Sequence, residues 1–241
     1  MCLYFNEELV DTKAEPFFNI QCGSEGSSKN FDMQPDNFGE NISSENRYWS
    51  EITGLFWAWK NLDKVDYVGL CSYRRFFNLV NSKRPLEIVK VASSSARLDN
   101  IDYTSIDEIF KTKDVILPVP YTYAWSIRRV LSMNYNDSDF DILENHIKEC
   151  HPDYYEAYRY VNYRSNKAIG HNMFIMKWSD FQEYCEWVFS ILFTMQSLID
   201  PKCYPKHQVR VFGYMHEVLL SVYVQKKRMK IHRSQILWID N

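Results

Sequence analysis

The stretch DYVGLCSYRRFF, residues 66–77, decides the fold class that the rest of the chain must fit. Residues 67–71 form a short apolar run with one glycine inside it, a pattern typical of a strand that is buried on both faces of a sheet. The chain then turns polar at four consecutive residues, Ser72, Tyr73, Arg74 and Arg75. The stretch therefore predicts a buried strand whose carboxyl end carries two neighbouring guanidinium groups.

Two interpretations of this arginine pair stay open. In open α/β sheets, ligands bind in the crevice beyond the carboxyl ends of the strands. Because a guanidinium group is planar and permanently charged, Arg74 and Arg75 would suit a phosphate or a carboxylate. Ser72 and Tyr73 would then line the same site. Alternatively, the two arginines lie on the surface in front of the aromatic residues 76–77, which close the core.

Length and composition favour one globular domain with an aromatic cleft. The chain has 241 residues, and we expect a single domain over residues 1–241. Aromatic residues make up 16% and include 17 tyrosines, which favours a large core and a cleft that stacks on flat or ring-shaped ligands. The net charge of −3 predicts no general attraction to nucleic acid.

The cysteines, the first residues of the chain and the length of the apolar runs indicate the cellular compartment. The six cysteines are scattered and have no partner histidines at metal spacing, so we expect reduced thiols and neither a disulfide framework nor a zinc site. The first ten residues lack the pattern of a signal peptide, and no apolar run reaches membrane-spanning length. These features predict a cytoplasmic protein.

Strand patterns and helix patterns alternate along the chain, which predicts an α/β fold with one mostly parallel central sheet flanked by helices. We expect strands near residues 2–5, 17–22, 67–71, 114–118 and 170–176, and long helices near residues 47–62, 137–151, 152–164, 180–199 and 208–226. The motifs GxGxxG, GxxxxGK[ST] and GxSxG are absent, which disfavours dinucleotide dehydrogenases, P-loop enzymes and α/β-hydrolases. A site built at strand ends from Arg, Asn, His and a carboxylate remains, and such a set can bind a sugar nucleotide.

A long polar loop at residues 23–44 ends where the helix at residues 47–62 begins. Loops of this length inside a compact domain are usually functional. Asn41 and Ser43 lie at the helix start, where free amide groups and the helix dipole favour an anion. We therefore expect Asn41 and Ser43 to line the nucleotide side of the donor site.

The last long helix contains a single acid, Glu217, within the apolar run VFGYMHEVLLSVYV. A buried unpaired charge is costly, so Glu217 is either a catalytic base or the partner of Arg210, about two turns earlier on the same face. His171 and Asn172 precede another buried strand. We expect His171, Asn172 and Arg210 to contact the acceptor or the donor sugar.

Four blocks of the chain carry a family resemblance: GENISSENRYWSEITGLFWAWKN, DYVGLCSYRRFF, HNMFIMKWSDFQEYCEWVFSILF and QVRVFGYMHEVLLSVYV. In this order they resemble a bacterial family of capsular and exopolysaccharide glycosyltransferases, long classed as a domain of unknown function. The resemblance implies a GT-A-like nucleotide-diphosphosugar transferase fold and transfer of a sugar onto a capsular, exopolysaccharide or O-antigen glycan. Some similar proteins are galactofuranosyltransferases, which makes a UDP-sugar such as UDP-galactofuranose a plausible donor.

The chain departs from the family pattern at two positions. Ser72 stands where the family usually has histidine, and Val218 stands where it usually has arginine after the glutamate. The first departure bears on donor selectivity and metal dependence, and the second removes a cation that would orient Glu217. Mn²⁺ or Mg²⁺ is therefore left open as a cofactor and no metal ligand is assigned, since Arg74 and Arg75 could neutralise a diphosphate directly.

Other functions remain as alternatives to a glycosyltransferase. The two departures are compatible with a catalytically silent module that binds a nucleotide-sugar or a glycan. The basic segment at residues 226–233 is too short to favour nucleic acid in a chain of negative net charge. It suits either peripheral contact with the inner membrane, where a lipid-linked acceptor resides, or a solvated edge strand. Donor, acceptor, linkage, stereochemical outcome and oligomeric state are not determined by the sequence.

Overall fold

The computed structural model describes residues 1–4, 17–29, 31–79, 88–92 and 104–240. In these ranges the main sheet has nine strands: β1 (Cys2–Tyr4), β2 (Asn19–Gln21), β3 (Gln34–Pro35), β4 (Tyr67–Ser72), β5 (Arg75–Asn78), β6 (Ile88–Ala92), β7 (Val115–Pro118), β10 (Phe174–Lys177) and β11 (Ile231–Asp240). A second, two-stranded sheet joins β8 (Tyr121–Thr122) to β9 (Lys167–Ala168).

The α-helices of the described residues are α1 (Asn46–Trp49), α2 (Ile52–Asn61), α3 (Ser105–Phe110), α4 (Ile127–Asn134), α5 (Asp137–Cys150), α6 (Pro152–Arg159), α7 (Trp178–Leu198) and α8 (Val211–Lys226). Short helical turns occur at η1 (Ser24–Gly26), η2 (Ser43–Glu45), η4 (Tyr160–Arg164) and η5 (Pro201–Cys203). The predicted α/β class is confirmed, and so are the long helices predicted near the positions of α5, α7 and α8, with shifts of a few residues at their ends. The helix predicted at residues 152–164 is α-helical to Arg159 and continues as the π-helical turn η4. No helix in the described ranges combines the length and the apolar character that crossing a bilayer requires.

The main sheet is mixed, so the prediction of a mostly parallel sheet is wrong. Its strands follow the order β10-β7-β11-β5-β4-β1-β2-β3, with β6 paired to β11. Pairing is parallel at β1–β2, β1–β4, β2–β3, β6–β11 and β7–β11, and antiparallel at β4–β5, β4–β10, β7–β10 and β5–β11. The antiparallel pairs arise where a tight turn at residues 73–74 reverses the chain and where β10 and β11 pair with strands that run the opposite way.

The stretch at residues 66–77 is thus a hairpin rather than a single strand with an open end. The predicted buried strand is confirmed as β4, and Phe76 and Phe77 are buried in β5, 0% and 4% exposed. Arg75 begins β5 and lies opposite Trp238 of β11. The last strand, β11, lies between β5 and β7 in the strand order. The basic segment at residues 226–233 runs from the end of α8 into β11, where residues 231–233 are half-buried and pair with β7, while the pairing with β5 begins at Gln235. Among the described residues, the strand part of this segment is therefore paired on one side, as the predicted edge strand would be.

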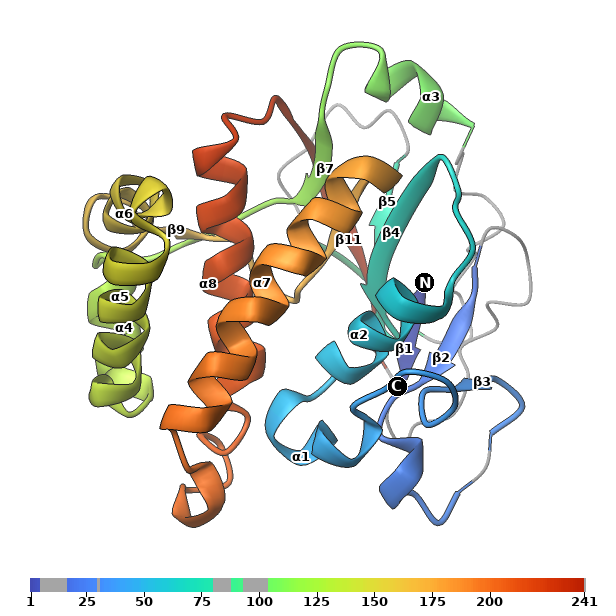
Figure 1. Cartoon of the computed structure of the whole chain (residues 1–241). Helices are drawn as coiled ribbons and strands as arrows, with labels where there is room; N and C mark the ends of the chain where they lie inside the picture. Colours follow the sequence, from blue (N-terminus) through green and yellow to red (C-terminus); the bar gives the residue numbers. More distant parts are fainter. Residues whose placement is uncertain (5–16, 30, 80–87, 93–103, 241) are drawn as a thin grey trace.

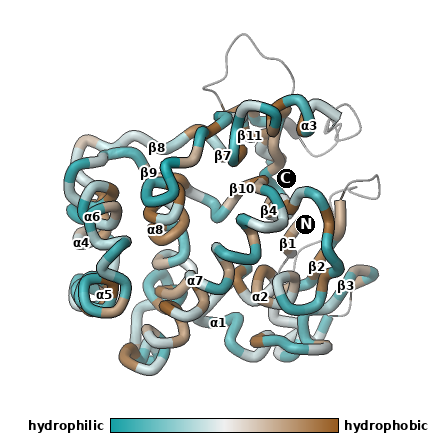
Figure 2. The backbone as a smooth tube through the Cα atoms, turned by 45° about the horizontal axis from the view of Figure 1, so that its top comes forward, coloured by the Kyte–Doolittle hydropathy of each residue, from teal (hydrophilic) through white to brown (hydrophobic). Residues whose placement is uncertain are grey.

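Helices α4 to α8 form two groups, which Figure 1 shows on one side of the sheet, whereas α3 contributes Phe110 to the smaller core on the other face. Helices α7 and α8 pack against each other, and α6 contacts α8. Helices α4, α5 and α6 form the outer group, so that α8 lies between them and the sheet; Figure 2 shows the same arrangement from another direction. Successive residues of β10 alternate between the two faces: Phe174 and Met176 belong to the large core under the helices, and Ile175 to the smaller core.

The helix predicted at residues 47–62 is broken in the structure. Ser50 has a φ of 54°, which ends α1 and lets α2 begin in a new direction. The side-chain amide of Asn46 donates to the Ser50 carbonyl oxygen (2.7 Å), and Gly213 of α8 packs close against the same break. The break sets Glu51 at the start of α2, facing α8 and the loop before β10.

Candidate functional site

The site is organised by a turn at His171 and Asn172, directly before β10. Both residues have left-handed backbones, with φ of 69° and 54°. Such conformations are uncommon outside glycine and cluster at functional sites. The backbone N–H of His171 donates to Oε1 of Glu217 (2.9 Å), and the side-chain amide of Asn172 donates to Oε1 of Glu51 (2.8 Å). Two adjacent residues thus each hold one carboxylate.

Glu217 projects from the middle of α8 and is partly buried. Burial, together with the negative charge of Glu51, raises its pKa from 4.5 to about 7. The hydrogen bond from the His171 N–H and the charges of Arg75 and Arg210 oppose this rise. A carboxyl group with a pKa near neutrality can both accept and release a proton under physiological conditions.

His171 lies between this carboxyl group and the sheet. Its Nε2 shares a hydrogen bond with the Tyr121 hydroxyl, and its ring meets the Trp238 ring edge to face, with centroids 5.6 Å apart. Burial and the neighbouring charge of Arg75 lower the pKa of His171 to about 4, so the ring is neutral at pH 7. Gly170 allows this approach, because a Cβ there would lie 2.7 Å from a Tyr121 ring carbon.

Arg75 supplies the positive charge of the site. Its guanidinium carbon lies 4.2 Å from the centre of the Trp238 ring, and Nη1 donates a long hydrogen bond to the Ser72 hydroxyl (3.5 Å). Its Nε is buried, and no acceptor among the described residues lies within hydrogen-bond distance of it. A buried guanidinium donor without a protein acceptor can bind an anionic ligand.

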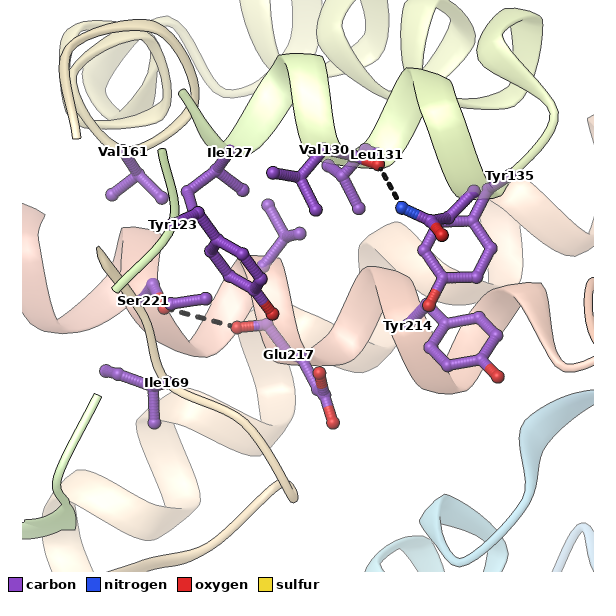
Figure 3. A pocket seen from close by; sticks show the side chains of 13 residues that line it. Tyr123, Ile127, Val130, Leu131, Tyr135, Val161, Ile169, Tyr214, Glu217 and Ser221 are labelled. Carbon is purple, nitrogen blue, oxygen red and sulfur yellow. Dashed lines mark hydrogen bonds between the residues drawn. The ribbon is translucent and has the colours of Figure 1, made fainter. Parts of the chain in front are cut away.

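Glu217 also borders a cavity of about 270 Å³, which is lined by residues of α4, η4 and α8. Figure 3 shows the Glu217 side chain and three tyrosine rings extending into the same space. The walls are mostly aliphatic, and Tyr135 and Tyr214 pack together with ring centroids 4.3 Å apart. The lining residues are Tyr123, Ile127, Val130, Leu131, Asn134, Tyr135, Val161, Ala168, Ile169, Tyr214, Glu217, Val218 and Ser221.

The structure thus brings together several residues that the sequence singled out: Glu217, His171, Asn172, Arg75 and Ser72. Arg210 is exposed at the start of α8 and donates to the Tyr214 hydroxyl (3.5 Å). No ion pair within 4.0 Å joins it to Glu217 among the residues described, so the proposed Arg210–Glu217 salt bridge is absent. Tyr73 and Arg74 form the hairpin turn, where the guanidinium of Arg74 lies over the Tyr73 ring at 4.9 Å.

Asn41 and Ser43 belong to a separate polar network around Asp36. The Ser43 side chain is 1% exposed, donates to Oδ1 of Asp36 (2.5 Å) and accepts from the Glu25 N–H (3.0 Å). Asn41 accepts from the Ser43 N–H (3.1 Å), so that amide is already used. The Ser43 hydroxyl therefore holds the loop through Glu25 and Asp36. Contact of Asn41 and Ser43 with the donor stays a prediction.

Three site residues were missed by the sequence analysis: Glu51, Tyr121 and Trp238. Glu51 sits inside an apparently continuous helix pattern, and Trp238 reads as one more core aromatic. Within the described ranges, no group of three His, Cys, Asp or Glu side chains is arranged to hold a metal ion. Among the described residues, the His171–Asn172 turn holds two acids, Glu51 and Glu217.

Comparisons with known proteins agree with this architecture. The family model described as "Domain of unknown function (DUF4422)" matches residues 6–228. A structure of the bifunctional glycosyltransferase WbbM in its apo state superimposes with a TM-score of 0.86 at 24% sequence identity. The match covers 100% of this chain and 45% of that one, so the chain spans less than half of the WbbM polypeptide. No match is found among curated proteins.

Proposed function

We propose, from the premise that this chain belongs to the DUF4422 family, that it is a glycosyltransferase with a GT-A-like fold. It would move a sugar from a nucleotide-diphosphate donor to a hydroxyl group of a glycan acceptor. The observation that carries the proposal is the placement of Glu217. Its carboxyl group, with a pKa of about 7, borders a cavity with aliphatic walls and three tyrosines, and it lies within the electrostatic influence of Arg75, whose Nε–H has no acceptor among the described residues. The likeness of fold to WbbM supports the same reading.

On the sheet side, the donor diphosphate would bind Arg75. The Arg75 guanidinium lies over the Trp238 ring, and its Nε–H has no acceptor among the described residues, which suits a phosphate oxygen. Ser72, Tyr73 and Arg74 would complete the donor site from the same hairpin. Arg75 would neutralise part of the diphosphate charge. Mn²⁺ or Mg²⁺, if the enzyme uses one, would add to this neutralisation.

On the helix side, the acceptor would occupy the cavity beneath α4. Aliphatic walls with a few polar groups are typical of small-molecule sites, and the rings of Tyr123, Tyr135 and Tyr214 offer flat surfaces to a sugar. An acceptor hydroxyl in this cavity would be within reach of Glu217, which lines it. His171 and Asn172 would line the boundary between donor and acceptor.

The reaction then needs one proton acceptor and one charge stabiliser. Glu217 takes the proton of the acceptor hydroxyl while the oxygen of that hydroxyl bonds to the anomeric carbon of the donor sugar. The bond from that carbon to the diphosphate breaks, and the nucleoside diphosphate leaves with the electron pair, stabilised by Arg75. Since only ionised Glu217 can act as a base, turnover should rise as the pH increases through about 7.

We further propose which donor and which acceptor this glycosyltransferase uses. A UDP-sugar such as UDP-galactofuranose as donor, and a capsular, exopolysaccharide or O-antigen glycan as acceptor, are consistent with the family resemblance. The reaction would then take place in the cytoplasm, at the inner face of the membrane if the acceptor is lipid-linked. A silent nucleotide-sugar or glycan-binding module is the alternative, in which Glu217 would bind a sugar hydroxyl without chemistry.

The test is Glu217→Gln, assayed with a panel of nucleotide-sugars for donor hydrolysis and for transfer to added glycans. Glutamine keeps the size of the side chain and cannot accept the proton, so turnover should fall at least about a hundredfold while donor affinity stays unchanged. Glu183→Gln is the matched control, because Glu183 is an exposed acid on α7 that pairs with Lys227 (2.6 Å). Wild-type turnover in Glu217→Gln would rule out the base, and binding without turnover in the wild type would favour the silent module.

Stability measurements separate a catalytic Glu217 from a scaffold residue. The folded-state pKa of Glu217 lies above its value of 4.5 in the unfolded chain, so ionisation weakens the fold as the pH rises from about 4.5 to 7. Glu217→Gln removes that penalty. We expect the variant to melt at a higher temperature than the wild type at pH 8 and at a similar temperature at pH 4.5.

A further inference from the structure

A buried chain of hydrogen bonds leads from α7 to the Glu51 carboxylate. The Tyr184 hydroxyl bonds His216 Nε2 (2.9 Å), and His216 Nδ1 bonds the amide oxygen of Asn172 (2.7 Å). Asn172 then donates its amide N–H to Glu51 (2.8 Å). The side chains of Tyr184 and His216 are 0% exposed and Asn172 is 2% exposed. No step of the proposed transfer uses this chain.

The direction of every hydrogen bond in the chain is determined by chemistry. Burial lowers the pKa of His216 to about 3, so its ring is neutral at pH 7. The amide oxygen of Asn172 can only accept, so His216 Nδ1 carries the hydrogen and Nε2 accepts from the Tyr184 hydroxyl. With its oxygen occupied, the Asn172 side chain is oriented so that its NH₂ group points at Glu51.

The same turn holds the second carboxylate. His171 donates its backbone N–H to Glu217, and the next residue, Asn172, holds Glu51. The left-handed backbone at both residues is what directs the two donors at two different acids. The turn therefore fixes the separation of the two carboxylates, and the chain through His216 and Tyr184 fixes the turn.

We propose that Glu51 is a positioning residue for Glu217: the His171–Asn172 turn holds the two carboxyl groups as a pair, so that the negative charge of Glu51 acts on the base. Without this neighbour, Glu217 would be a weaker base. The inference rests on the proposed function only for the use made of that proton, since the pairing of the two acids is a property of the fold.

The other charged and titratable groups around Glu217 come from several elements. Arg75 of β5 and Arg210 at the start of α8 favour its ionised form, and His171 is neutral. The tyrosines whose hydroxyl pKa values are themselves raised in part by the Glu217 charge are Tyr121, Tyr123 and Tyr135. Among these groups, Glu51 supplies the negative charge that acts against Arg75 and Arg210.

The experiment follows the side-chain carboxyl signal of Glu217 by ¹³C NMR as a function of pH, in protein labelled at its glutamates. Glu217→Gln identifies the signal by its loss. In the full wild-type chain we expect a midpoint near pH 7, the pKa that the structure gives to Glu217. In Glu51→Gln, which keeps the hydrogen bond from Asn172 to an oxygen, the midpoint should fall by about one pH unit, as loss of a neighbouring like charge requires.

Two further variants keep the test decisive. Asn172→Gly suits the left-handed backbone and removes the amide that holds Glu51, so the midpoint should fall by roughly half as much as in Glu51→Gln. Glu45→Gln is the matched control: Glu45 also accepts one amide hydrogen bond, from Gln196 (2.9 Å), and its replacement should leave the midpoint unchanged. Circular dichroism confirms that each variant is folded.

An unchanged Glu217 midpoint in both folded Glu51→Gln and folded Asn172→Gly would overturn the pairing. An equal fall in Glu45→Gln would overturn it as well, because the effect would then be general. The NMR titration needs no substrate. A shifted midpoint in a protein that transfers no sugar would therefore reject the proposed function and keep the pairing, and an active enzyme with an unshifted midpoint would do the reverse.

Discussion

Two pairs of adjacent arginines, Arg74–Arg75 and Arg128–Arg129, look alike in the sequence and differ in what surrounds them. Arg128 lies on α4 and is 9% exposed, and its guanidinium binds the carboxylates of Asp137 and Asp141 on α5. It also donates to the Asp137 carbonyl oxygen (3.3 Å). Arg75 lies over the Trp238 ring, and among the described residues its single hydrogen bond is a long one to Ser72.

The difference teaches which arginine is available to a ligand. The Asp137 and Asp141 side chains, four residues apart on α5, fill the fork of Arg128, so this cation joins two helices. The fork of Arg75 has no carboxylate within ion-pair distance among the described residues, although Glu217 is near enough to be influenced by its charge. An arginine whose hydrogen bonds are taken up by carboxylates of the protein, such as Arg128, stabilises the fold. An arginine without such carboxylates, such as Arg75, can bind an anionic ligand.

The largest effect that would break this comparison is expected at Arg75. Arg75→Ala should weaken the binding of a nucleotide-sugar by roughly 1.5–3 kcal/mol, the value of a hydrogen bond to a charged group, with the fold intact. Isothermal titration calorimetry with UDP-sugars measures it. Arg75→Lys keeps the charge without the planar fork and should recover only part of the affinity. Unchanged affinity in folded Arg75→Ala would place the diphosphate elsewhere.

A smaller effect, on stability rather than binding, is expected at Arg128. Its two partners are 58% and 60% exposed, so the loss lies between that of a surface pair and that of a buried one. Arg128→Ala should lower the free energy of unfolding by about 2 kcal/mol and leave donor affinity unchanged. Urea denaturation monitored by circular dichroism gives the number. Loss of donor binding without loss of stability would show that the two arginine pairs have exchanged roles.

The smallest effect is expected at Arg129, which is exposed beside Arg128. Arg129→Ala should change the free energy of unfolding by less than about 0.5 kcal/mol, as surface substitutions usually do, and should not alter donor affinity. The same denaturation and calorimetry experiments apply. A clear drop in donor affinity would sharpen the comparison by assigning this arginine, and the surface around it, to substrate binding.

The sequence by itself determined the α/β class, the positions of the main helices and the choice of Glu217 as a candidate catalytic base. These are local properties: apolar periodicity reports helices and strands, and one acid in an apolar helix is visible as a letter among its neighbours. The apolar run before Ser72 likewise determined the buried strand β4. Each of these inferences needed only residues close together in the chain.

The tertiary structure alone decided the direction of the strands and the partners of the charged residues. The hairpin at residues 73–74 and the insertion of β11 between β5 and β7 made the sheet mixed, because strand pairing joins segments far apart in the sequence. Glu51 became a site residue because the break at Ser50 brings it against Asn172, which lies 121 positions after Glu51 in the chain. Charge, burial and hydrogen bonding depend on such neighbours, which local sequence does not record.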